Sequence, residues 1–320
     1  RVLKNKGLND VTIISPSSKN SYEELGEYSS ALTRLAWRAL ISADILRKLL
    51  LKTRPYEINR GETDAVHVEC LKLLCQVIEN PEIDLKRKFH EIINTLIFIR
   101  DKFRMIPANY TRKKPLIGVV GEIFCRLNEF SNSWLIKIIE DHGGEAWLSN
   151  IAEWVWYTNF ERERRLRLDG KKYSLEMLSA RIKNFIQKRD EHKLFEPFSE
   201  DFYGYEEPSS VKEVLEYSKP YLPYWGALGE MVLSVGTSVY LYNKGVDGVV
   251  DISPFTCMNG IVCEAVFPNV SRDHDNIPIR NFYFDGTQSD LDRDIGIFME
   301  LALTYKNRKS VKRRYPFYFN

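Results

Sequence analysis

The stretch that most constrains the fold is DGVVDISPFTCMNGIVC, at Asp247–Cys263. It begins with an apolar run, Val249–Ile252, which stops at Pro254, and a segment with a helical pattern starts at Met258. A buried strand that leads through a tight loop into a helix is the basic unit of an open α/β sheet, in which ligands bind outside the carboxyl ends of the strands. Cys257 falls in that loop. The positive end of a helix dipole favours the thiolate there, although a free cysteine is also often a small buried apolar residue.

Strand-like and helical runs alternate elsewhere in the second part of the chain. We expect strands at Leu116–Val120, Ala146–Leu148 and Ile279–Phe284. A loop is expected over Glu122–Asn132, and helices at Trp134–Asp141, Gly226–Asn243 and Leu291–Lys306. Alternation of this kind predicts an α/β fold, a Rossmann-like parallel sheet with helices on both faces, over residues 113–320.

The first 112 residues have a different pattern. Apolar residues recur at steps of three or four in Ser21–Leu51, Ala65–Glu79 and Leu85–Phe103, which predicts an N-terminal region of helices. We expect Cys70 and Cys75 in the second helix to be core residues. A polar segment with a proline, residues 102–114, marks the boundary between the two regions.

Three further expectations concern segments outside these elements. The opening residues predict the end of a helix followed by a strand at Val11–Ser15, so we expect the chain to be the C-terminal piece of a longer protein. Residues from about 160 to 215 are charged and helical, and we expect a helical insertion with a solvated basic face, anion contact being the alternative. Asn307–Asn320 predicts a loosely docked tail.

Composition narrows the class of protein. The net charge of +2 gives no argument for nucleic-acid binding, and five cysteines form no regular disulfide framework. No apolar run approaches the ~18 residues that a membrane span needs. The glycines around the first strand do not form the GxGxxG fingerprint, which argues against dinucleotide binding of that type.

Five segments resemble a known family. They are GEIFCRLNEFSN (Gly121–Asn132), GGEAWLSNIAEWVWY (Gly143–Tyr157), SPFTCMNG (Ser253–Gly260), NFYFDGT (Asn281–Thr287) and TRPYE (Thr53–Glu57). Together they resemble the 2-hydroxyacyl-CoA dehydratase-like family, and in particular the C-terminal part of its large fused members, the CoA-substrate-specific enzyme activases. The resemblance extends over nearly the whole chain, in order.

The resemblance implies a cytoplasmic protein of an anaerobe that carries an iron–sulfur cluster, either [4Fe–4S] or double-cubane. An ATP-hydrolysing activator would be its partner and supply electrons at low potential. Dehydratase members eliminate water from 2-hydroxyacyl-CoA, which makes an acyl-CoA the candidate substrate, whereas related reductases act on small molecules. The oligomeric state stays open, with a dimer as one alternative. Whether this chain is enzymatic also stays open, and we expect the fragment alone to be inactive.

The same resemblance makes Cys257 the first candidate cluster ligand, because it matches the cysteine that follows PF in the family. Cys125 is a second candidate ligand, since both cysteines would lie at carboxyl ends of strands and could face one crevice. The family's other ligand cysteines lie in an upstream half that this sequence does not contain. A [4Fe–4S] cluster needs about four ligands, so we expect no intact cluster on this chain alone.

Polar residues beyond the strand ends complete the candidate site. Glu122 and Arg126, just beyond the first strand of this domain, are the candidate catalytic residues. Arg126 is the more informative of the two, because a guanidinium can pair with a phosphate or an anionic cluster. Asn128 and Asp285 are candidate cofactor-binding residues, and Glu230 lies at a helix start. For each of them a surface or capping role is the alternative. Two functions remain: part of a cluster-binding dehydratase or ATP-driven reductase, or a non-catalytic docking or regulatory module without its own cluster.

Overall fold

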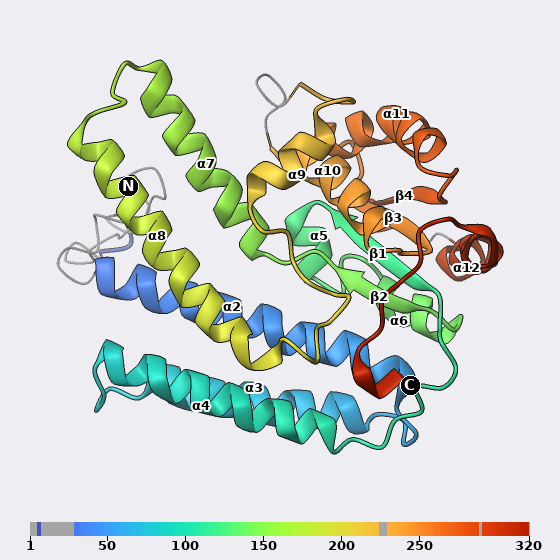
Figure 1. Cartoon of the computed structure of the whole chain (residues 1–320), viewed down its shortest axis with the longest axis horizontal. Coiled ribbons are helices and arrows are strands. Elements are labelled where there is room, and N and C mark those ends of the chain that lie inside the picture. Colours follow the sequence, from blue (N-terminus) through green and yellow to red (C-terminus); the bar gives the residue numbers. More distant parts are fainter. Residues whose placement is uncertain (1–4, 8–28, 224–228, 288–289, 320) are drawn as a thin grey trace.

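A computed structural model describes residues 5–7, 29–223, 229–287 and 290–319, and its centre is a parallel sheet of four strands. The strands are β1 (Leu116–Gly121), β2 (Glu145–Leu148), β3 (Gly248–Pro254) and β4 (Ile279–Phe284), in the order β2-β1-β3-β4 (Figure 1). The expected parallel α/β fold is therefore confirmed. All four strands begin within two residues of their predicted starts.

Helices cover both faces of the sheet because successive side chains of a strand point to opposite sides. Ile117 and Val119 of β1 pack in one apolar cluster with residues of α6 (Leu135–Asp141) and α12 (Leu291–Arg308). Leu116 and Val120 of the same strand pack in a second cluster with residues of α10 (Glu230–Asn243) and α11 (Met258–Asp273).

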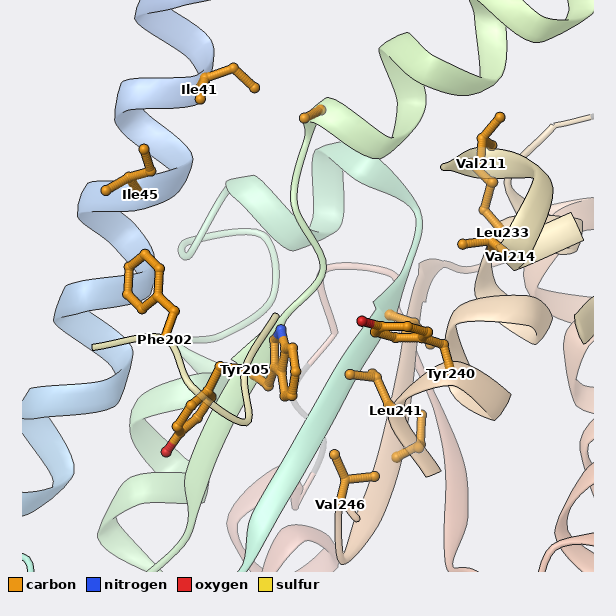
Figure 2. Packing of buried hydrophobic residues seen from close by; sticks show 14 of the residues in the cluster. Ile41, Ile45, Phe202, Tyr205, Val211, Val214, Leu233, Tyr240, Leu241 and Val246 are labelled. Carbon is orange, nitrogen blue, oxygen red and sulfur yellow. The ribbon is translucent and has the colours of Figure 1, made fainter. Parts of the chain in front are cut away.

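The second cluster extends into the N-terminal helices. These are α2 (Ser29–Thr53), α3 (Glu62–Glu79) and α4 (Leu85–Arg104), with the short η3 (Arg54–Tyr56) after α2. Figure 2 shows Ile41 and Ile45 of α2 as members of the same cluster as Phe202, Tyr240 and Leu241. One continuous apolar core thus joins the helical region to one face of the sheet.

A helical segment separates β2 from the second half of the sheet. It contains α7 (Ala152–Leu168), α8 (Leu175–Phe195), η4 (Glu196–Phe198) and α9 (Val211–Ser218). The insertion starts at residue 152, earlier than the expected 160. The Asp44 carboxylate fixes this start, since it accepts hydrogen bonds from the Ile151 and Ala152 main-chain N–H groups at 3.3 and 3.1 Å.

Two local expectations were wrong. The loop expected at Glu122–Asn132 contains the short helix α5 (Ile123–Leu127), which Glu122 caps. Cys70 is buried but Cys75 is exposed. Five residues along a helix correspond to about 140° of rotation, so one packed face cannot hold both.

The expectation of a loosely docked tail was also wrong. Lys309 and Arg313 are buried and pair with Asp247 and Glu145 at 2.6 and 2.7 Å. The tail ends in η5 (Phe317–Phe319), whose last residue is buried. The expected strand Val11–Ser15, the first residues of the helix expected from Ser21 and the start of the helix expected from Gly226 lie outside the described residues.

Candidate functional site

The carboxyl ends of β1 and β3 come into unusually close contact. Gly121, the last residue of β1, has φ +117°, and a Cβ atom there would lie 2.1 Å from the main-chain oxygen of Ile252. The next N–H group, that of Glu122, donates a hydrogen bond to the same oxygen at 2.8 Å. A glycine is required here, and its conformation directs the chain from β1 into α5 across the end of β3.

Helix α5 presents the predicted residues Cys125 and Arg126. The Glu122 carboxylate accepts a hydrogen bond from the Cys125 N–H at 2.7 Å and so caps the helix. Both Cys125 and Arg126 are buried. Glu122 therefore has the capping role that is the alternative to a catalytic one.

Arg126 is a buried cation at the centre of the site. Its Nη1 donates a hydrogen bond to the Ser149 main-chain oxygen at 2.9 Å, at the end of β2. Its Nε has no hydrogen-bond partner among the described residues, and none of their carboxylates lies within 4.0 Å of it as an ion pair. The positive charge of Arg126 still influences four carboxyl groups at longer range. It partly offsets the rise in pKa that burial causes at Asp44, Glu153, Glu230 and Asp251.

Burial dominates the electrostatics of these carboxyl groups. It raises the pKa values of Asp44, Glu153 and Asp251 to about 7 in each case. Burial also raises the pKa of Glu230, whose carboxylate accepts a hydrogen bond from the Ile123 N–H at 3.0 Å. The site thus contains carboxyl groups that can exchange protons near neutral pH, a property common at functional sites.

Sequence reasoning found only Glu230 in this set. Asp251 carried a usable signal, because it interrupts the apolar run VVDI of a central strand. In the structure it is buried and accepts a hydrogen bond from Asn281 at 2.7 Å on β4. Asp44 and Glu153 gave no such signal, since each lies in an ordinary helical pattern and reaches the site only through tertiary packing.

Cys257 stands at the end of β3 as the N-cap residue of α11 and is half-buried. The preceding residue, Thr256, has φ +66°, and the Cys257 N–H donates a hydrogen bond to the Pro254 oxygen at 3.1 Å. The Cys257 sulfur lies near enough to Cys125 to raise the pKa of that thiol electrostatically. The adjacent ends of β1 and β3 thus place the two candidate ligands at the same edge of the sheet.

Cys125 and Cys263 are both buried, and their surroundings differ. Burial, the Glu122 carboxylate and the Cys257 sulfur raise the pKa of Cys125 to about 12, which keeps its thiol protonated at neutral pH. Cys263, six residues after Cys257, is buried, and its S–H donates to the Met231 oxygen at 3.7 Å. Cys263 is therefore a core residue.

Asn128 and Asp285 use their side chains within their own loops. The Asn128 Oδ1 accepts a hydrogen bond from the Ser131 N–H at 3.0 Å. Asp285 is exposed and accepts hydrogen bonds from the N–H and hydroxyl of Thr287 at 2.8 and 2.6 Å. Neither side chain makes a hydrogen bond to Cys125 or Cys257 among the described residues.

The fit of an iron–sulfur cluster can be tested on this donor set. Within the described ranges, no group of three or more His, Cys, Asp or Glu side chains is arranged to hold a metal ion. A [4Fe–4S] cluster needs about four ligands. A complete cluster therefore does not fit the part of the chain that the structure describes, which offers two thiols at most at this edge of the sheet.

A wide groove of about 900 Å³ lies beside this edge of the sheet. It is lined by residues of α7, α8, α9 and the 199–210 segment, and Asn150 and Glu153 connect it to the end of β2. Its aromatic lining includes Trp156, Phe160 and Phe195. Burial raises the pKa of Glu191 in the groove to about 8. Sites for small ligands typically have volumes of about 300–1,000 Å³, and the volume of this groove lies within that range.

Comparisons with protein-family models, curated proteins and solved structures found no match for this chain. Among the described helices, none has both the length and the apolar character that a membrane span requires.

Proposed function

We propose that this chain is the C-terminal part of a 2-hydroxyacyl-CoA dehydratase-like iron–sulfur protein, or of its fused activase. It would act in the cytoplasm and contribute one side of a cluster crevice that receives low-potential electrons from an ATP-hydrolysing activator. The observation that carries the proposal is the convergence of Cys125 and Cys257 at the ends of two adjacent parallel strands. Ligand sites of open α/β sheets form at such strand ends.

The surroundings of the two cysteines support a crevice shared with another domain or subunit. Phe124 precedes Cys125, and Phe255 and Met258 flank Cys257, and all three apolar side chains are exposed. Exposed apolar patches commonly mark interaction surfaces. The missing ligands would come from the covering partner, which agrees with the upstream ligand cysteines that the family resemblance implies.

The test is anaerobic purification of the full-length protein with iron supplied, followed by iron and sulfide analysis. We expect a brown protein with stoichiometric iron, and a large loss of iron in Cys257→Ser without a change in melting temperature. Cys75→Ser is the matched control, because that cysteine is exposed on α3. Full iron content in Cys257→Ser would exclude Cys257 as a ligand and count against the proposed function.

A second candidate function is a docking or regulatory module for an activator or dehydratase partner, without its own cluster. The protonated Cys125 and the lack of a third ligand among the described residues favour it. A colourless full-length protein after anaerobic purification with iron would select this alternative.

A further inference from the structure

Helix α8 exposes a line of large apolar side chains, which we call the α8 seam. Its members Leu175, Leu178, Ile182 and Phe185 have exposed fractions of 83%, 55%, 51% and 68%. Isolated exposed apolar residues are ordinary, but four on one side of one helix mark an interaction surface.

The spacing of the seam fits a helix as its partner. Steps of three, four and three residues are those of the a and d positions of a heptad repeat. At 100° per residue the four side chains fall within about 80° of the helix circumference, a narrow stripe rather than a broad apolar face. Such a stripe fits the ridge of another helix, whereas a helix that lies on a membrane needs a wider apolar face.

The opposite side of α8 is already occupied. Its buried residues are Met177, Ala180, Gln187, Asp190 and Leu194. Met177 and Ala180 pack with Leu166 of α7, and Asp190 pairs with Arg38 of α2 at 2.8 Å. The seam therefore lies on a helix that is held on its other side by α7 and α2, and Figure 1 shows α7 and α8 as a projecting hairpin.

The charges around the seam are mainly positive. Residues 161–193 contain eleven Lys or Arg and six Asp or Glu. Arg181 and Arg189 are exposed on the seam side of α8, and Lys171 and Lys172 stand in the turn before it. Glu176 pairs with Lys171 at 3.1 Å, and Asp190 is shared by Arg34, Arg38 and Arg189, so these two acidic residues leave a positive excess around the seam. A second copy of α8 would bring like charges together, while a helix with acidic flanks would be attracted.

We propose that the α8 seam binds an amphipathic helix with acidic flanks that belongs to another protein. The apolar side chains of that helix would pack along the seam, and its Glu or Asp residues would face Arg181 and Arg189. Binding at this place requires neither Cys125 nor Cys257, so it can be tested separately from the iron–sulfur function.

The test uses labelled peptides of about three heptads with Leu at positions a and d. One peptide carries Glu at positions e and g, a second carries Lys there, and a third has the Glu composition in scrambled order. Fluorescence anisotropy with the intact chain should show binding of the Glu peptide, at least tenfold weaker binding of the Lys peptide, and none of the scrambled one. Binding of the Glu peptide should weaken as salt is added.

A matched pair of variants locates the binding surface. Leu178→Asp should reduce affinity for the Glu peptide at least tenfold. Leu301→Asp should leave it unchanged, because Leu301 is also 55% exposed on a helix, α12. Both sites are exposed, so circular dichroism and melting temperature should match the wild type. Arg181→Glu with Arg189→Glu should shift the preference towards the Lys peptide.

Three results would overturn the proposal. The first is a Glu peptide that does not bind, or that binds Leu178→Asp as well as wild type. The second is a dimer in sedimentation that Leu178→Asp dissociates, which would make the seam a contact between copies of this chain. The third is binding of phosphatidylserine vesicles to the wild type but not to Leu178→Asp while no peptide binds, which would make the seam a membrane contact.

Discussion

Arg313 donates a hydrogen bond from Nη2 to Oε2 of Glu145 at 2.7 Å, and both side chains are buried. Glu145 is the first residue of β2, and Arg313 belongs to the C-terminal tail. The hydroxyls of Tyr56 and Tyr205 also donate to the Glu145 carboxylate. This buried, hydrogen-bonded pair fastens the tail to the edge strand of the sheet.

We expect Arg313→Ala to lower the free energy of unfolding by about 3–5 kcal/mol, because it leaves the Glu145 carboxylate buried without its cation. Urea denaturation with tryptophan fluorescence measures the change. Arg60→Ala is the control: it breaks the exposed pair with Asp141 and should cost less than about 1 kcal/mol. Equal losses in the two variants would show that the buried Arg313–Glu145 pair stabilises the fold no more than the exposed Arg60–Asp141 pair does.

Asp44→Asn tests the buried carboxyl group at the start of α7. Burial raises the pKa of Asp44 from an ordinary value of 3.8 to about 7, so the folded state holds the proton more tightly than the unfolded state. The wild type is then most stable relative to Asp44→Asn below pH ~4, and loses that relative stability as the pH rises to ~7. The full change should be about 4 kcal/mol.

Urea denaturation of wild type and Asp44→Asn at several pH values between 4 and 8 measures this effect. The Asn side chain keeps one oxygen that can accept a hydrogen bond from the N–H of Ala152 but loses the acceptor for the N–H of Ile151. The charge is therefore tested by how the stability difference changes with pH, not by its absolute size. Asp169→Asn, which removes an exposed carboxylate, is the control. A stability difference between wild type and Asp44→Asn that stays constant with pH would contradict the prediction.

The two cysteines of α3 should respond differently to the same substitution. Cys70 is fully buried, so Cys70→Ser buries a hydroxyl for which the site provides no hydrogen-bond partner. The substitution should lower the free energy of unfolding by about 1–3 kcal/mol. Cys75 is exposed, and Cys75→Ser should stay within about 0.5 kcal/mol of wild type. Thermal unfolding followed by circular dichroism distinguishes them. Equal effects would mean that α3 does not present the two residues to different surroundings.

Gly236→Ala tests the contact between α9 and α10. A Cβ atom at Gly236 would lie 2.1 Å from the main-chain oxygen of Val214, so the helices must separate, at a cost of about 1–3 kcal/mol or more. Gly296→Ala on α12 is the control, because its new atom would meet only the His142 side chain, at 3.1 Å, and alanine favours the helix. The urea midpoint should fall in Gly236→Ala and should not fall in Gly296→Ala. Unchanged stability in Gly236→Ala would show that the α9–α10 contact can relax.

Much of the secondary structure could be predicted because apolar periodicity reports local geometry. The strand Ile279–Phe284 was predicted with the bounds that the structure gives, and the helix Leu85–Phe103 lacks only its last residue, Arg104. Short elements were harder. Five residues, Ile123–Leu127, are too few to show a helical period, and the Glu122 cap that starts α5 becomes visible only once its side chain is placed.

The candidate site was predicted in part, for a topological reason. In a parallel sheet the residue after each strand falls on one edge, so Cys125 and Cys257 could be assigned there from strand positions alone. The same rule gave Asn128 and Asp285, whose side chains bond within their own loops instead. Strand position predicts which edge a residue occupies, but not the direction of its side chain.

By itself the sequence determined the alternation of strands and helices, and with it the parallel sheet, because these depend on patterns within short windows of the chain. Only the tertiary structure decided which charges became buried together. Asp44, Arg126, Glu153 and Asp251 come from four elements distant in sequence, and Arg313 reaches Glu145 from the far end of the chain. Their burial arises from packing between elements, so the energies that shift their pKa values and fasten the tail depend on long-range contacts that no local pattern specifies.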